Sequence, residues 1–245
     1  MIEITEDRLL GGRLVLRQPA EGYRAAIDPV LLAASIPASE TDAVLDIGCG
    51  VGAASLCLGA RQAGCRIAGI EIQRDLVRLG GENIELNGFA GRVSIMQGDL
   101  LRPPPRLEPG SFNHVMANPP FLEEGTATPP IDRSRREAHV EGEADLRAWV
   151  RFALAMARPK GSVTFIHRAD RLDRLMAELA GRVGEIVVFP LWPGAGKPAK
   201  RVILRGRKDV GTPLRLAPGL VLHEPEGAFT AEAEAILREG RALSL

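Results

Sequence analysis

The sequence has few cysteines, no net charge and no long apolar run, and each absence excludes a class of protein. The three cysteines, Cys49, Cys57 and Cys65, are odd in number and form no Cys-x-x-Cys pair, so neither a disulfide framework nor a zinc knuckle is indicated. No apolar run approaches the roughly 18 residues of a membrane span. The acidic segment 1–7 lacks the basic-then-apolar layout of a secretory signal. We therefore expect a soluble, reduced, cytoplasmic protein without a metal site.

Charge is balanced over the whole chain. Lysine and arginine number 31, as do aspartate and glutamate, which gives a net charge of +0. Bulk charge therefore does not indicate a nucleic-acid partner, and any basic surface has to be local. Two local clusters occur: the first is Arg133, Arg135 and Arg136, and the second is Lys197, Lys200, Arg201, Arg205, Arg207 and Lys208. Each cluster either binds phosphates or is an ordinary solvated face, and the charges leave both interpretations open.

Strand-like apolar runs alternate with helix-like segments through most of the chain. The expected strands are 44–47, 66–71, 92–96, 112–117, 162–167, 186–189 and 201–204, and the expected helices between them are 53–63, 74–85, 146–157 and 170–180. This alternation predicts parallel βαβ units and an α/β fold with a doubly wound, seven-stranded, mostly parallel sheet. The last two strands are joined without a helix signal, so we expect the last strand to be antiparallel to its neighbour.

The two ends of the chain add shorter elements. Apolar runs on both sides of Gly11-Gly12 predict a hairpin, and Asp28 followed by Pro29 predicts a helix start with Asp28 as the cap. A helix-like run covers residues 230–238. No linker or internal repeat is present, so we expect one domain over 1–245. Its expected parts are an N-terminal hairpin and helix at 1–40, a core at 41–210 and a C-terminal extension at 211–245.

A glycine-rich loop follows the first expected strand of the core. The run 46–52, Asp-Ile-Gly-Cys-Gly-Val-Gly, contains Gly48 and Gly50 after Asp46. Glycines let the backbone approach a nucleotide-like ligand, and the following helix N-terminus offers free N–H groups. The dinucleotide spacing Gly-x-Gly-x-x-Gly is absent, and an acidic residue begins the loop, which favours S-adenosylmethionine over NAD.

Two further carboxylates follow the next two expected strands. Glu71 closes the second strand, where it can accept both hydrogens of a ribose diol, and Asp99 follows the third, where it can accept from an adenine amino group. Either carboxylate alone could be a local cap. Because the carboxyl ends of parallel strands in such a sheet border one crevice, we expect Asp46, Glu71 and Asp99 to form one cofactor site.

The turn Asn118-Pro119-Pro120-Phe121 closes the fourth expected strand. Neither proline has an N–H group to donate, and each biases the preceding residue towards extended backbone. The carbonyls of this turn are therefore free to accept hydrogens. Together with the Asn118 amide and the flat ring of Phe121, they suit a planar group that carries an amino group. The alternative interpretation is a turn that merely ends a strand.

Together these motifs resemble class I S-adenosylmethionine-dependent methyltransferases of the amino-methylating group. The run 23–33, Tyr-Arg-x-x-Ile-Asp-x-Val-Leu-Leu-Ala, narrows the resemblance to the bacterial tRNA1(Val) (adenine-37-N6)-methyltransferase family, and the runs 82–88 and 198–204 support it. The resemblance covers nearly the whole chain. It implies S-adenosylmethionine as the cofactor, tRNA as the substrate, and Tyr23 and Asp28 as further residues of the cofactor site.

The resemblance also implies a chemical role for the turn. Asn118, Pro119, Pro120 and Phe121 are the expected catalytic residues, acting on the exocyclic 6-amino group of an adenine in RNA, and Asn118 also borders the cofactor. Phe121 stands where tyrosine is also common in amino methyltransferases, a change that keeps the stacking face. The expected phosphate contacts to tRNA are Arg133, Arg135, Arg136, Lys197, Lys200 and Arg201.

Other functions remain open at this point. An Asn-Pro-Pro-aromatic turn also suits a guanine amino group in ribosomal RNA or a glutamine amide in a protein. Those relatives resemble longer chains with an extra N-terminal domain, whereas only about 40 residues precede the first strand of the core here. A DNA adenine methyltransferase would want a target-recognition domain, for which there is no room. A cofactor-binding module without activity is a further alternative.

Overall fold

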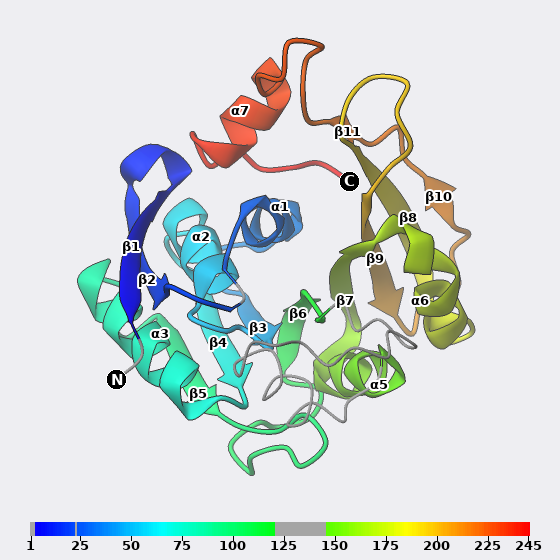
Figure 1. Cartoon of the computed structure of the whole chain (residues 1–245). Coiled ribbons are helices and arrows are strands. Elements are labelled where there is room, and N and C mark those ends of the chain that lie inside the picture. Colours follow the sequence, from blue (N-terminus) through cyan, green and yellow to red (C-terminus); the bar gives the residue numbers. More distant parts are fainter. Residues whose placement is uncertain (1–2, 23, 121–145) are drawn as a thin grey trace, which may run out of the picture.

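A nine-stranded β-sheet runs through the structure, a computed structural model that describes residues 3–22, 24–120 and 146–245 (Figure 1). The strand order is β5-β4-β3-β6-β7-β9-β8-β10, with β11 also paired to β8. The bounds are β3 Ala43–Ile47, β4 Arg66–Glu71, β5 Val93–Gln97, β6 Phe112–Ala117, β7 Ala157–Arg168, β8 Val183–Trp192, β9 Arg201–Lys208, β10 Arg215–Leu216 and β11 Leu220–Val221.

The predicted α/β fold is confirmed. Strand β9 runs antiparallel to both β7 and β8, and the other pairs in this sheet are parallel. The seven predicted strands are all present, and the sheet is widened by the two-residue strands β10 and β11. Runs this short carry no period-2 pattern, so sequence patterns do not reveal them.

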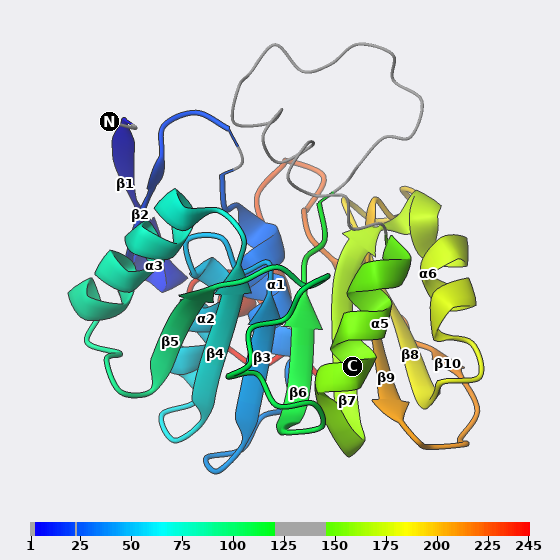
Figure 2. The ribbon, with the colours of Figure 1, turned by 90° about the horizontal axis from the view of Figure 1, so that it is seen from below.

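Helices cover both faces of the sheet (Figure 2). Their bounds are α1 Ile27–Ser35, α2 Ala53–Arg61, α3 Arg74–Leu86, α5 Leu146–Met156, α6 Leu172–Leu179 and α7 Ala231–Leu237. In β3, Val44 packs into the apolar cluster of α1, α2 and α3, whereas Leu45 and Ile47 pack into the cluster of α5 and α6. Successive side chains of a strand point to opposite faces, so an almost wholly apolar strand is what a doubly covered sheet requires.

The N-terminal hairpin forms as predicted, from β1 Ile4–Leu9 and β2 Leu14–Pro19 around the 3₁₀ turn η1 Leu10–Gly12. One prediction here is wrong. Asp28 does not cap α1, because the helix begins at Ile27 with Ala26 at the cap position. The Asp28 carboxylate instead accepts a hydrogen bond from Arg201 Nε at 3.0 Å. A cation on β9, far away in sequence, therefore holds a group that local sequence assigns to the helix end.

The C-terminal extension packs against the same face as the hairpin (Figure 1). Helix α7 is capped by Thr230, whose Oγ1 accepts from Ala233 N at 3.2 Å. Beyond it, the Leu243 N–H donates to the Ala34 carbonyl of α1 at 2.9 Å. None of the helices in the described ranges is both long and apolar enough to cross a membrane.

Candidate functional site

Three neighbouring strands end side by side at the centre of the sheet. Ile47, the last residue of β3, lies opposite Ile70 of β4 and Ala117 of β6. The next residues along these chains are Gly48, Glu71 and Asn118. The register therefore brings the glycine loop, one predicted cofactor carboxylate and the start of the Asn-Pro-Pro turn together at the carboxyl ends of these strands. We call this end of the sheet, marked by Gly48, Glu71 and Asn118, the site edge.

The glycines of the loop are required for different reasons. Gly48, Gly50 and Gly52 all have positive φ, at 63°, 56° and 87°, a region that side chains disfavour. A Cβ atom at Gly48 would lie 2.3 Å from Cη2 of Trp149, and one at Gly52 would lie 2.8 Å from Cδ1 of Ile95. A Cβ atom at Gly50 would meet open space. Packing thus fixes the first and third glycines, while the second borders room for a ligand.

Glu71 connects the glycine loop to the end of β4. Glu71 is 7% exposed, and its carboxylate accepts from Gly50 N at 3.0 Å through Oε2 and from Gln73 N at 2.9 Å through Oε1. These two bonds tie the glycine loop to the segment that follows β4. The predicted contact of Glu71 with a ribose diol stays a prediction.

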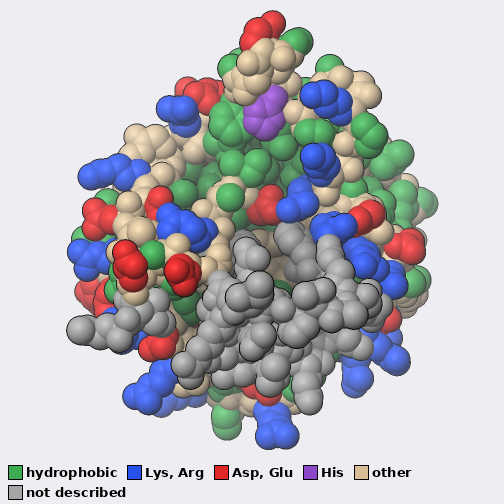
Figure 3. Space-filling model, in the orientation of Figure 1, with side chains coloured by type: hydrophobic (Ala, Val, Ile, Leu, Met, Phe, Trp, Pro, Cys, Tyr) green, Lys and Arg blue, Asp and Glu red, His purple; other side chains and the backbone are tan. Residues whose placement is uncertain are grey.

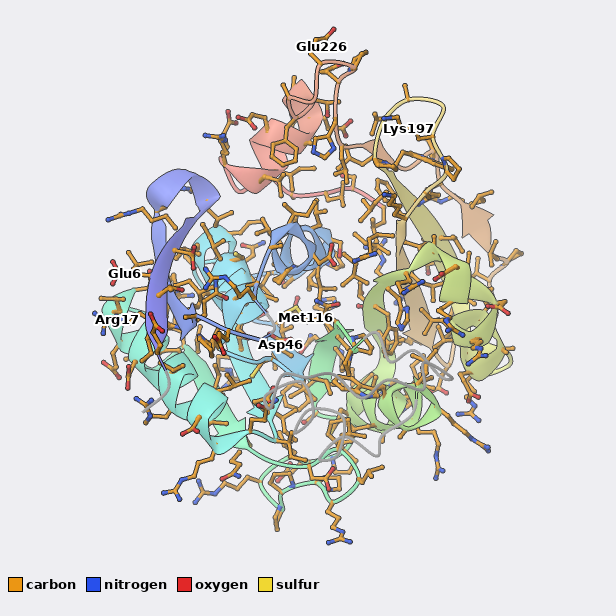
Figure 4. The ribbon with its side chains drawn as sticks, in the orientation of Figure 1. Glu6, Arg17, Asp46, Met116, Lys197 and Glu226 are labelled. Carbon is orange, nitrogen blue, oxygen red and sulfur yellow. The ribbon has the colours of Figure 1, made fainter. Side chains whose placement is uncertain are left out.

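Asp46 lies beneath the loop, near the centre of the sheet (Figure 4). Asp46 is 2% exposed, and Ser55 Oγ of α2 donates to its Oδ2 at 2.7 Å. The pKa of Asp46 is raised to about 7, chiefly by burial and to a smaller extent by the nearby Glu71 charge, while the hydrogen bonds from Ser55 act to lower it. Asp46 therefore joins the loop to the first turn of α2, and its predicted contact with the cofactor stays a prediction.

The remaining predicted residues lie at the same edge or outside the described ranges. Asp99 is half-buried just beyond β5, and its Oδ1 accepts from Leu101 N at 2.8 Å. Asn118 is half-buried, Pro119 buried and Pro120 exposed. The predictions for five residues lie outside the described residues: Tyr23, Phe121, Arg133, Arg135 and Arg136.

Two residues that sequence reasoning does not assign to the site support the loop. Trp149 of α5 packs against Gly48 so closely that its ring fills the space a Cβ atom there would need. Asn83 of α3 is fully buried, and its Nδ2 donates to the Val51 carbonyl of the loop at 3.0 Å. The sequence holds a signal for Asn83, because it lies four residues after the apolar Leu79 and therefore on the same face of the helix, which is the buried one. Trp149 gives no such signal.

The second basic cluster does not form one surface. Because β9 is antiparallel, Arg201 lies at the site edge of the sheet, while Arg207 and Lys208 lie at the opposite edge. Arg205 is half-buried, and its Nη1 donates to the Ser35 carbonyl at the end of α1 at 3.5 Å. This burial lowers the pKa of its guanidinium. Arg207 is paired with Glu185 at 3.0 Å. The interpretation of 197–208 as one phosphate-binding stretch is therefore wrong beyond Arg201.

Metal ligands do not gather in the described part of the chain: no three His, Cys, Asp or Glu side chains come together there in a way that could hold an ion. The three cysteines are buried free thiols. What the site edge offers instead is a glycine loop with outward space, buried carboxylates and amide and carbonyl acceptors. These groups suit a nucleoside-like cofactor and a planar amino group.

Comparison with known proteins agrees with this site. Residues 26–134 match the family model described as the methyltransferase small domain, a match that includes the loop, both strand-end carboxylates and the Asn-Pro-Pro turn. Two similar curated proteins are named tRNA1(Val) (adenine(37)-N6)-methyltransferase. The one from Dyadobacter fermentans is 24% identical over 88% of this chain and 88% of its own length. The one from Yersinia pestis is 27% identical over 85% of this chain and 83% of its own length.

Solved structures agree on the fold. A predicted O-methyltransferase from Agrobacterium tumefaciens has a TM-score of 0.75 at 22% identity and covers 89% of this chain and 99% of its own. Geranyl diphosphate methyltransferase in complex with S-adenosylmethionine has a TM-score of 0.52 at 15% identity, over 74% of this chain and 84% of its own. The family model and the curated relatives confirm the resemblance to methyltransferases that the sequence motifs indicate, and the solved structures support the fold.

Proposed function

We propose that this protein transfers a methyl group from S-adenosylmethionine to the exocyclic 6-amino group of an adenine in tRNA. The observation that carries the proposal is the placement of Asn118 beside the glycine loop, set by the register of Ala117 with Ile47. A cofactor held by the loop and a base held by the Asn-Pro-Pro turn would then meet at one edge of the sheet. The names of the similar curated proteins support adenine in tRNA as the substrate.

The cofactor side of the site rests on backbone and buried carboxylates. The open space beside Gly50 fits a close approach of the ligand, and Glu71 and Asp99 would accept from its ribose and adenine. Asp46 would act from below, by holding the loop to Ser55. Asp28 and Tyr23 are proposed at the rim of the same site, with Asp28 oriented by Arg201.

The substrate side supplies hydrogen-bond acceptors. S-adenosylmethionine, when bound, supplies an electrophilic methyl group on a sulfonium. The adenine amino group is a poor nucleophile because its lone pair is delocalised into the ring. The Asn118 side-chain oxygen and the Pro119 carbonyl would accept its two hydrogens and favour a pyramidal nitrogen whose lone pair points at the methyl. This stabilises the transition state more than the ground state, and fixed orientation adds further acceleration.

An adenine within folded RNA has to be splayed out to reach this turn. Phe121 and Pro120 would hold the extruded base, and stacking of this kind is worth about 1–3 kcal/mol. Phosphate contacts are proposed for Lys197, Lys200 and Arg201, and for Arg133, Arg135 and Arg136 of the run after the turn. Such contacts position the RNA without reading its sequence.

The proposal is tested with labelled S-adenosylmethionine and three substrate pools: total tRNA, ribosomal RNA and protein extract, each from cells that lack this gene. Nucleoside analysis should find the label as N6-methyladenosine in tRNA. Label in guanosine or in protein would contradict the proposed substrate while leaving the cofactor site intact. Cofactor binding without transfer to any pool would favour a module without activity.

A further inference from the structure

The charges of this neutral protein are segregated along the chain. Residues 146–215, which contain α5, β7, α6, β8, β9 and the first residue of β10, hold 15 lysines and arginines against 5 aspartates and glutamates. The described residues before position 121 hold 11 basic and 14 acidic side chains, and residues 216–245 hold 2 basic and 5 acidic ones. One half of the sheet with its helices therefore carries an excess of ten positive charges, which the other parts balance.

This segregation is visible on the face that contains the site edge. In Figure 3, lysine and arginine side chains gather on the side of β8, β9 and α6, whereas acidic and basic side chains mix on the side of the hairpin. Figure 4 places Lys197 on the loop between β8 and β9 and places the Glu6–Arg17 pair on the opposite side, on the hairpin. The hairpin at 4–19 holds three basic and two acidic side chains, so it lacks the excess of positive charge with which the other half attracts a polyanion.

The positive half reaches the site through a cluster at the carboxyl end of β7 and the amino end of β9. Arg168 lies directly opposite Arg201 in the β7–β9 ladder, a placement of like charges that disfavours the pair. Asp170 pairs with Arg168, and Asp28 pairs with Arg201. The Ala169 N–H donates to the Lys200 carbonyl at 3.1 Å, which fixes the loop that carries Lys200 against the end of β7.

Three further cations of this cluster have no acidic partner among the described residues. Lys197 and Lys200 are exposed, and Arg171 follows Arg168 in the short turn that leads into α6. Both acidic partners of the cluster are already occupied by Arg168 and Arg201. Free cations beside a like-charged pair form a surface whose natural complement is a chain of phosphates.

We propose that this cluster, formed by Arg168, Arg171, Lys197, Lys200 and Arg201, is where the phosphate backbone of the RNA crosses the edge of the protein. The RNA then continues over the α6 side and turns away from the N-terminal hairpin. This inference rests on the proposed function, and it adds the direction in which the RNA leaves the site and two contacts, Arg168 and Arg171, on the β7–α6 turn.

The test compares two triple variants of equal charge. One combines Arg171→Ala, Lys197→Ala and Lys200→Ala. The control combines Arg66→Ala, Arg106→Ala and Arg241→Ala, three exposed arginines that form no ion pair among the described residues. Cofactor affinity, measured by calorimetry, should equal the wild-type value in both variants. Binding of total tRNA is then measured by fluorescence anisotropy at several salt concentrations.

We expect the first variant to bind tRNA about tenfold or more weakly than the wild type at 100 mM salt. The slope of the logarithm of the binding constant against the logarithm of the salt concentration should be smaller in magnitude by about 2 to 3, because each lost phosphate contact removes roughly 0.7–0.9 from it. The slope of the control variant should differ from the wild-type slope by no more than one phosphate contact would contribute, roughly 0.7–0.9. Equal losses of tRNA affinity in both variants, or a wild-type salt slope in the first variant, would overturn this inference. In either case, methylation of tRNA by the wild-type protein would still uphold the proposed function. A wild-type protein that neither binds nor methylates tRNA would overturn both.

Discussion

The side-chain amide of Asn83 pairs with both backbone groups of Arg17, accepting from its N–H at 2.8 Å and donating to its carbonyl at 2.9 Å. Asn87, four residues later and directly after the last residue of α3, pairs in the same way with Val15 at 2.9 and 2.7 Å. Four helical residues rise about 6 Å, close to the roughly 6.8 Å of two strand residues. The two amides therefore form hydrogen bonds to the outer edge of β2 at the spacing that a neighbouring strand would have.

The two asparagines differ in one contact, and this difference gives a prediction. Asn83 also donates to the Val51 carbonyl of the glycine loop, whereas Asn87 donates to the Asn83 carbonyl of its own helix. We expect Asn83→Ala to destabilise the fold by about 2–4 kcal/mol, because it leaves buried backbone groups without partners. It should also weaken cofactor binding by about tenfold, since the loop loses its anchor.

Asn87→Ala is the matched control for that prediction. It removes the equivalent pairing with the hairpin but no contact with the loop, so it should lower the free energy of unfolding by about 1–2 kcal/mol and leave cofactor affinity unchanged. Urea unfolding and calorimetric titration measure the two quantities. A loss of cofactor affinity in both variants would mean that Asn83 acts only through general stability.

The glycine loop gives a second prediction from two neighbouring positions. Gly48→Ala forces a methyl group against Trp149, which should cost about 1–3 kcal/mol of stability by overpacking. Gly50→Ala points its methyl group into open space, so it should cost less stability but prevent the stabilisation that bound cofactor provides. Thermal unfolding with and without the cofactor separates the two effects.

Gly81→Ala serves as the reference for that comparison. Gly81 lies in the exposed part of α3, where a Cβ atom would meet open space. We expect the substitution to raise stability by about 0.5–1 kcal/mol, as it does in exposed helix interiors. If the cofactor raised the unfolding temperature of Gly50→Ala as much as that of Gly81→Ala, the placement of the ligand beside Gly50 would be contradicted.

Asp46 gives a prediction about pH. Its folded-state pKa is raised from 3.8 to about 7, mainly by burial. The folded protein therefore binds a proton that the unfolded chain releases, and the stability gained from it is complete below about pH 4 and lost as pH rises through 7. Asp46→Asn removes this dependence. Its stability relative to the wild type should rise between pH 5 and pH 8 by an amount on the order of a few kcal/mol, measured by urea unfolding without cofactor.

A constant difference between Asp46→Asn and the wild type over that range would contradict the raised pKa. Asparagine keeps an oxygen that can accept from Ser55, so the hydrogen bond to α2 is preserved. Ser55→Ala removes this hydrogen bond without removing the charge. Because that bond lowers the pKa of Asp46, its loss should make stability fall more steeply with pH.

What the sequence could predict is set by short-range patterns. The bounds of β4 and β6 match the expected ones because apolar runs and flanking turn residues are local signals. The convergence of Gly48, Glu71 and Asn118 also follows, since parallel strand ends meet at one edge. The local pattern misassigns Asp28 because its partner, Arg201, is distant in sequence, and no local rule foretells an ion pair across the fold.

The same limit explains the basic stretch and the pairing of α3 with the hairpin. Positions 197–208 look continuous in sequence, but a strand extends about 3.4 Å per residue, so β9 carries Arg201 and Lys208 to opposite edges of the sheet. The pairing of Asn83 with Arg17 depends on the orientation of α3 against β2, which only the tertiary structure fixes.

The most direct test of this account is single-turnover kinetics of Asn118→Ala with tRNA, with cofactor affinity measured separately. Loss of the amide removes one of two proposed acceptors for the amino hydrogens, and we expect the rate of methyl transfer to fall by about a hundredfold or more, as for other aligned transition-state contacts. Cofactor affinity should change by less than about threefold, because in the proposed site the backbone of the loop and the buried carboxylates would hold most of the ligand. Near-normal transfer by Asn118→Ala would contradict the account and move the chemistry away from the end of β6.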